Sequence, residues 1–132
     1  MIAVIQRVVE CSVYINESKY SDIEKGILVL VGIAHGDNDI DISYIGDKVL
    51  NLRIFSDFNG KMNKSLKDIN GDVMLVSQFT LHADCKKGNR PSFIKAEKAE
   101  KAQEIYLRLL DYLHKTNLNS YKNILEQLNI RK

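Results

Sequence analysis

Several features are scarce in this sequence of 132 residues, and each scarcity excludes a class of protein. The longest apolar run, Ile27 to Ala34, has about eight residues, whereas a membrane-spanning helix needs about 20, so the run predicts a buried strand. The N-terminus has no basic region before its apolar stretch and no small-residue cleavage site, which favours the cytoplasm over secretion. Cys11 and Cys85 are too few for a disulfide framework and lack zinc-site spacing, so reduced thiols are expected.

The sequence also has little excess of charge of either sign. Nineteen Lys and Arg residues against 17 Asp and Glu leave a net charge of only +2, which by itself does not indicate a nucleic-acid-binding protein. The cations are nevertheless clustered: Lys61 and Lys64 flank one loop, and Lys86, Lys87 and Arg90 crowd another. Such clusters either bind phosphates or simply keep a loop solvated, and the pattern alone leaves both alternatives open.

The hydrophobic pattern predicts a single domain over residues 1–132 of the α/β (α+β) class, with a mixed, largely antiparallel sheet and two main helices. Strands are predicted at Ile2–Val9, Cys11–Ile15, Tyr20–Ile23, Ile27–Ala34 and Asp72–His82. The strand at Ile27–Ala34 is expected to be central because it is apolar on both faces. Helices are predicted from the N-cap candidates Asp37-Asn38-Asp39 to Leu52, from Glu97 to about Lys115, and from about Asn119-Ser120 onward as a short amphipathic segment.

The most unusual local sequence lies at the end of the predicted strand Asp72–His82. Strand alternation would place Ser77, Phe79 and Leu81 on one face and Gln78, Thr80 and His82 on the other. Polar side chains in an otherwise apolar strand need partners if they are buried. The pattern therefore indicates either a functional site or a strand that leaves the core.

The same segment contains Ser77-Gln78-Phe79-Thr80-Leu81, followed by Lys87-Gly88-Asn89-Arg90-Pro91-Ser92-Phe93. These two blocks resemble the signature of the D-aminoacyl-tRNA deacylase family. Three earlier blocks match the same family in order: Ile5-Gln6-Arg7-Val8, Gly26–Gly32 and Arg53–Asn63. The resemblance covers residues 1–115, whereas residues 116–132 are atypical for the family.

This resemblance implies a homodimeric enzyme that hydrolyses the ester joining a D-amino acid, or glycine mischarged on tRNA(Ala), to the terminal ribose of tRNA. It implies no cofactor and no metal. Because the ester is already activated by the neighbouring ribose hydroxyl, the protein need not supply a strong nucleophile. Main-chain amides around the segment would stabilise the oxyanion. By resemblance, Gln78, Phe79 and Thr80 surround the oxyanion and adenosine, and Ser77 supports the strand geometry.

Two other chemistries for this segment are disfavoured. A Thr80 nucleophile would need an adjacent base, and His82, about 7 Å away along a strand, is geometrically possible, but the resemblance argues against the pair because family members commonly carry other residues at that position. A metal cluster of His82, Asp84 and Cys85 would lack a fourth ligand. The basic loop has a clearer interpretation, because Lys86, Lys87 and Arg90 next to the pocket would neutralise phosphates near the acceptor end of tRNA.

The C-terminal end departs from the family pattern. Members continue past the long helix with strands that contain a Gly-Pro-Val-Thr segment, whose cis glycine–proline pair excludes L-amino acids from the partner subunit's pocket. This sequence has one proline, Pro91, and it belongs to the other motif. Arg7, which matches the family arginine that holds the Gly-Pro segment, is therefore expected to lack its partner. The alternative function is a catalytically impaired tRNA-binding homologue with an end that is truncated or shifted.

Overall fold

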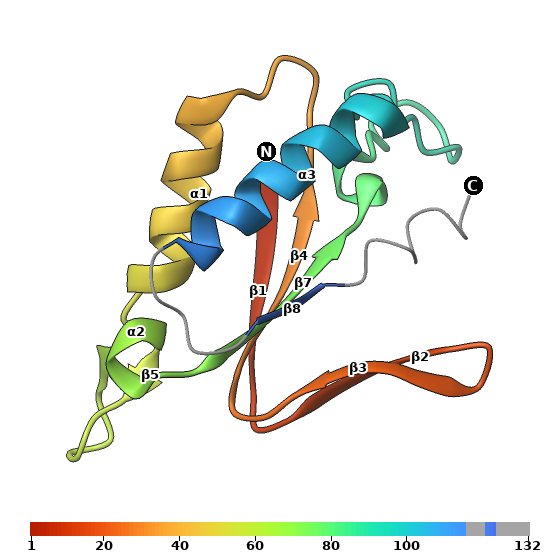
Figure 1. Ribbon diagram of the computed structural model, residues 1–132. Coiled ribbons are helices and arrows are strands. Elements are labelled where there is room, and N and C mark those ends of the chain that lie inside the picture. Colours follow the sequence, from red (N-terminus) through yellow and green to blue (C-terminus); the bar gives the residue numbers. More distant parts are fainter. Residues whose placement is uncertain (116–120, 124–132) are drawn as a thin grey trace.

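The computed structural model of the protein describes residues 1–115 and 121–123. Its main sheet has the strand order β1-β4-β7-β8 (Figure 1). These strands are β1 (Ile2–Val8), β4 (Gly26–Gly32), β7 (Asp72–Ser77) and β8 (Tyr121–Asn123). β1 runs antiparallel to β4, while the β4–β7 and β7–β8 pairs are parallel.

Two antiparallel hairpins lie outside this sheet. They consist of β2 (Cys11–Ile15) with β3 (Ser18–Ile23), and of β5 (Phe55–Ser56) with β6 (Met62–Lys64). Strands and helices interleave along the chain, so the predicted mixed α+β class is confirmed.

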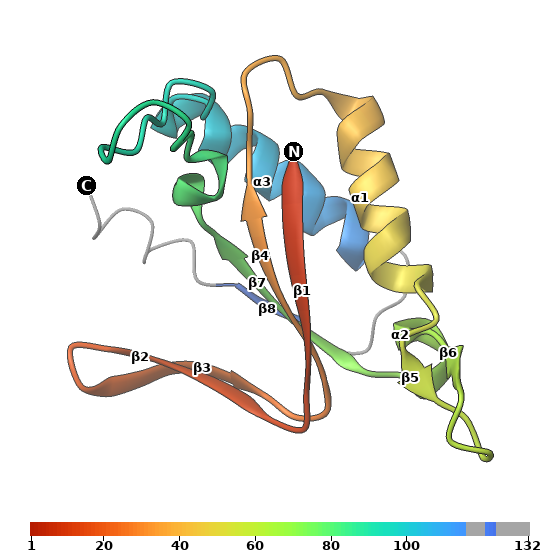
Figure 2. The same cartoon turned by 180° about the vertical axis from the view of Figure 1, so that it is seen from behind.

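Two long helices, α1 (Asp39–Asn51) and α3 (Ala99–His114), cover one face of the main sheet (Figure 2). α1 begins where the sequence predicts, because the Asn38 side chain accepts from the backbone N–H of Ile40 and Asp41 completes a capping box. A short helix, α2 (Leu66–Ile69), follows β6. Within residues 1–115 and 121–123, no helix has the length and apolar character needed to cross a bilayer.

Strand β4 is central, as its two apolar faces predict. Ile27, Val29 and Val31 are fully buried on the side covered by α1 and α3. On the opposite side, Met74 and Val76 of β7 form a smaller cluster with Ile23 of the β2–β3 hairpin. Burying apolar side chains on both faces is the main stabilising contribution to such a sheet.

The predicted strand Asp72–His82 is wrong beyond Ser77. β7 ends at Ser77, and Phe79–His82 form a 3₁₀ turn, η1. The backbone that follows β4 pairs with residues 95–97 instead of with a longer β7. The assignment of residues 78–82 to alternating strand faces is therefore also wrong.

The predicted helix starting near Asn119-Ser120 is wrong at Tyr121–Asn123. These residues form β8, which pairs with Val73–Leu75 of β7 and occupies that edge of the sheet. The rest of that predicted helix lies outside the described residues.

Candidate functional site

The candidate site is built on the turn that follows β7. The backbone N–H of Gln78 still donates to the Val31 carbonyl at 2.8 Å, so the chain remains attached to β4 one residue beyond the strand. It then bends, with Leu81 N–H donating to the Gln78 carbonyl and Ala83 N–H to the Thr80 carbonyl. The η1 turn is thus anchored to the rigid centre of the sheet.

The first two amides of η1 are available to a ligand. The N–H groups of Phe79 and Thr80 find no acceptor among the described residues, as expected for the first turn of a helix. Adjacent main-chain N–H groups can donate together to a developing oxyanion. The turn therefore offers two main-chain donors, and their role in the chemistry stays a prediction.

The side chains of the turn support this geometry. The Gln78 side-chain amide donates to the Thr80 hydroxyl, while Ser77 at the strand end is buried, with 8% of its surface exposed. The partner of Thr80 is an amide and not a base, so the structure offers no activated Thr80 nucleophile. Of the predicted residues, Ser77 ends strand β7, Gln78 precedes the turn, and Phe79 and Thr80 lie in η1 instead of on strand faces.

His82 holds the turn against the end of β4. Its Nε2 atom lies 2.9 Å from the Gly32 carbonyl oxygen, which links the last residue of η1 to the last residue of β4. A Cβ atom on Gly32 would lie 3.0 Å from both the His82 ring and Leu81 Cβ, and 3.1 Å from the Gln78 carbonyl. Gly32 is thus a supporting residue that the sequence analysis did not single out, although a glycine ending an apolar strand often marks a close backbone approach.

Two contacts fix the ends of the basic loop: one closes the loop on itself, and the other packs its end against the turn. Asp84 and Ser92 exchange backbone hydrogen bonds of 2.7 and 2.8 Å, which close residues 85–91 into a separate loop. The rings of Phe79 and Phe93 pack edge to face with centroids 5.4 Å apart. The structure therefore brings the predicted cations of this loop to the turn, and all three are exposed: Lys86, Lys87 and Arg90.

A shallow cleft of about 340 Å³ lies beside the turn, with Ile2, His82, Lys86 and Lys95 among its lining residues. The three residues considered for a metal are engaged separately. His82 contacts the Gly32 carbonyl, Asp84 accepts from the Lys86 backbone N–H, and Cys85 is exposed. Cys11 and Cys85 are both free thiols, as predicted.

Arg7 is not brought to this site within one chain. It pairs with Ile27 on β4, whereas Ser77 pairs with Val31, which places them about 13 Å apart along the strand direction. The Arg7 guanidinium donates to the Ile54 carbonyl at 2.8 Å and lines a different cleft of about 350 Å³ with Lys25. Arg7 as a substrate-binding residue stays a prediction.

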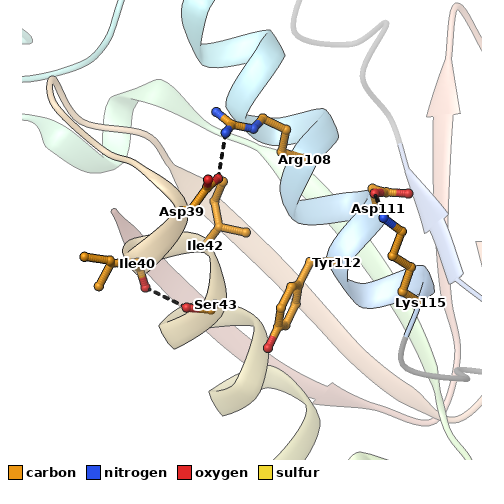
Figure 3. A pocket seen from close by; sticks show the side chains of 8 residues that line it. All are labelled: Asp39, Ile40, Ile42, Ser43, Arg108, Asp111, Tyr112 and Lys115. Atoms are coloured by element: carbon orange, nitrogen blue, oxygen red, sulfur yellow. Dashed lines mark hydrogen bonds and ion pairs between the residues drawn. The ribbon is translucent and has the colours of Figure 1, made fainter.

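A roomier cleft of about 530 Å³ between α1 and α3 is remote from the turn (Figure 3). Its charges are paired with one another: Arg108 with Asp39 at 2.7 Å, and Lys115 with Asp111 at 3.0 Å. It presents no unpaired acid, base or nucleophile, so its volume alone does not make it the candidate site.

Comparison with known proteins gives a consistent result. Residues 4–126 match the family model for D-Tyr-tRNA(Tyr) deacylase. A D-aminoacyl-tRNA deacylase from Clostridium novyi (strain NT) is 51% identical over 111 residues, which cover 84% of this chain and 74% of the relative.

Two solved structures share the fold. A chain described as c-Myc DNA Unwinding Element Binding Protein is 39% identical with a TM-score of 0.87, covering 92% of this chain and 82% of its own. A chain described as a probable eukaryotic D-amino acid tRNA deacylase has a TM-score of 0.71 at 19% identity, and the match covers 84% of this chain and 65% of that one. At that identity the second likeness concerns the fold alone.

Proposed function

The chain belongs to the D-Tyr-tRNA(Tyr) deacylase family, and from that premise we propose that it hydrolyses the ester bond of D-aminoacyl-tRNA. Water attacks the ester carbonyl, the bond to the ribose oxygen breaks, and the products are free D-amino acid and tRNA. The observation that carries the proposal is the η1 turn, whose two available amides lie beside a basic loop in a chain of this family.

The roles of the turn residues follow from their contacts. The N–H groups of Phe79 and Thr80 stabilise the oxyanion that forms when water adds to the carbonyl. Gln78 orients the Thr80 side chain through its hydrogen bond, and buried Ser77 holds the end of β7. The protein supplies position and charge stabilisation, while the neighbouring ribose hydroxyl activates the ester.

The basic loop contributes affinity rather than chemistry. Lys86, Lys87 and Arg90 are exposed next to the turn, where phosphates of the tRNA acceptor end would approach. Phosphate contacts of this kind release counterions, so substrate affinity falls as salt rises.

The deciding experiment compares hydrolysis of D-tyrosyl-tRNA and L-tyrosyl-tRNA by the purified chain. Loss of the D-ester alone supports a stereospecific deacylase, and loss of both esters supports a deacylase without chiral selection. Survival of both esters contradicts the proposal. A glycyl-tRNA(Ala) substrate in the same assay tests whether the achiral ester is also cleaved, as we propose.

A second candidate function is nucleic-acid binding without turnover. It is favoured by the similar chain described as c-Myc DNA Unwinding Element Binding Protein. Filter binding of uncharged tRNA, together with survival of both aminoacyl esters, would support this candidate against the first.

We further propose that the chain acts as a homodimer in the cytoplasm. Support for the dimer comes from β1, where Ile2 and Val4 expose 40% and 46% of their surfaces on the sheet face opposite α1 and α3. Sedimentation equilibrium of the intact chain tests this, and a monomer at micromolar concentration would contradict it.

A further inference from the structure

The β5–β6 hairpin carries an aromatic side chain that is fully exposed and buries no surface within the protein. Phe58, in the loop between these strands, is 103% exposed, and Met62 in β6 is 60% exposed. Single exposed apolar residues are common on protein surfaces and need no explanation by themselves. Phe58 is notable because the loop around it is rigidly built and positively charged.

The loop is held by the carboxylate of Asp57. This carboxylate accepts from the backbone N–H groups of Asn59 and Lys61 at 2.8 and 3.0 Å, and from the Asn63 side chain at 2.8 Å. Backbone hydrogen bonds between Asp57 and Lys61, and between Gly60 and Asp57, close the loop. Gly60 has a φ of +76°, a conformation suited to glycine. The loop backbone is therefore held in place before a ligand binds, so that only the Phe58 side chain has to be ordered on binding.

The hairpin and its surroundings carry a small excess of positive charge. The cations Arg53, Lys61 and Lys64 are all exposed, and within the described part of the chain none of them forms an ion pair within 4.0 Å. The two nearby carboxylates, Asp57 in the loop and Asp68 in the cap of α2, accept hydrogen bonds from within the protein and keep their negative charge. Arg53 donates to the Asn63 carbonyl and side-chain oxygens, which are uncharged.

We propose that this hairpin is a second nucleic-acid contact. An unpaired base of the nucleic acid stacks on Phe58, and the neighbouring backbone phosphates bind Lys61 and Lys64. An exposed aromatic ring between cations is the arrangement with which proteins bind single-stranded nucleic acid, since every base has a face that can stack. An anionic ligand fits the displayed charge better than an apolar protein surface does. The inference rests on the proposed function only in taking an RNA ligand.

The hairpin is distinct from the site at η1. In Figures 1 and 2 it lies at the opposite end of the main sheet from the loop at residues 85–91. A ligand that bridges both places would be held at two points, which raises affinity without a change in the chemistry.

The test uses Phe58→Trp as a reporter, because the chain contains no tryptophan of its own. Titration of this variant with uncharged tRNA and with a single-stranded RNA oligonucleotide is expected to quench its fluorescence, as stacking requires. Phe58→Ala should bind both RNAs about tenfold more weakly than the wild type. Ile40→Ala is the matched control: Ile40 is 76% exposed on α1, away from the hairpin, and its removal should leave binding unchanged.

Three results would overturn the inference. They are unchanged RNA affinity of Phe58→Ala, unchanged fluorescence of Phe58→Trp at saturating RNA, and a shift of Phe58→Ala from dimer to monomer in sedimentation, which would mark the loop as a contact between copies. Because RNA without an attached amino acid contains no aminoacyl ester, these results are independent of turnover. A chain that binds RNA through Phe58 but spares both aminoacyl esters would contradict the deacylase proposal and leave this inference standing.

Discussion

Gly32→Ala should slow catalysis through a small displacement of the η1 turn. The added Cβ would lie 3.0–3.1 Å from His82, Leu81 and the Gln78 carbonyl, whereas ordinary contacts begin near 3.4 Å. The turn must therefore move by a few tenths of an ångström, and the Phe79 and Thr80 amides move with it. A misplacement of about 1 Å can cost about 100-fold in rate, so we expect kcat to fall about three- to tenfold.

The same substitution should also lower stability, because it overpacks a buried position and strains the His82–Gly32 hydrogen bond. We expect a loss of about 1–2 kcal/mol in the free energy of unfolding, or roughly 3–8 °C in Tm. Single-turnover hydrolysis of D-tyrosyl-tRNA measures the first effect, and thermal unfolding followed by circular dichroism measures the second.

Gly71→Ala provides a matched control. Its Cβ would meet Leu66 Cδ1 at 2.8 Å and Ile69 Cδ1 at 3.1 Å, a comparable overlap in a place remote from η1. It should lower Tm and leave the rate of the folded protein unchanged. The reasoning is refuted if Gly32→Ala keeps the wild-type rate, or if Gly71→Ala loses as much rate as Gly32→Ala does.

Three further predictions concern stability, pH and salt. Tyr106→Phe removes the hydrogen bond from a fully buried hydroxyl to the Leu75 carbonyl at 2.7 Å, so the free energy of unfolding should fall by about 1–2 kcal/mol in urea denaturation; an unchanged midpoint would contradict this. Hydrogen bonds from the Asn63 side chain and nearby backbone hold the pKa of Asp57 below its ordinary value. Stability from this carboxylate is therefore present above about pH 4 and lost as pH falls through the lower folded pKa, which loop amide shifts in NMR should follow in the wild type and not in Asp57→Asn. Lys87→Ala should reduce the slope of log affinity for tRNA against log salt by about one, and an unchanged slope would exclude a phosphate contact.

The sequence predicted the parts of the fold that depend on long, regular patterns. The run at Ile27–Ala34 is apolar on both faces and became the central strand β4. Asn38 carries the cap that starts α1, as the side-chain chemistry of asparagine favours. In β4 and α1 the same hydrophobic pattern continues over several residues, so contacts with neighbouring elements do not override the local structure that it favours.

The errors lie where a short segment is decided by tertiary contacts. Polar and apolar residues alternate through Ser77–His82 as in a strand, yet the backbone after Gly32 pairs with residues 95–97 instead, and the chain turns into η1. Tyr121–Asn123 likewise pairs with β7, which its helical pattern did not indicate. The candidate residues Ser77–Thr80 stay a prediction as a site, and their arrangement across the end of β7 and the start of η1 required the structure.

The backbone closure between Asp84 and Ser92 makes residues 85–91 an independent insertion. Since both ends are fixed by two hydrogen bonds, a change in the length or charge of this loop need not be transmitted to the amides of Phe79 and Thr80. Loops tolerate such changes far better than the elements that they connect. Under the proposed function, the loop is therefore a separate unit: a change in its charge would alter the affinity for tRNA, while the turn that would act on the ester is kept.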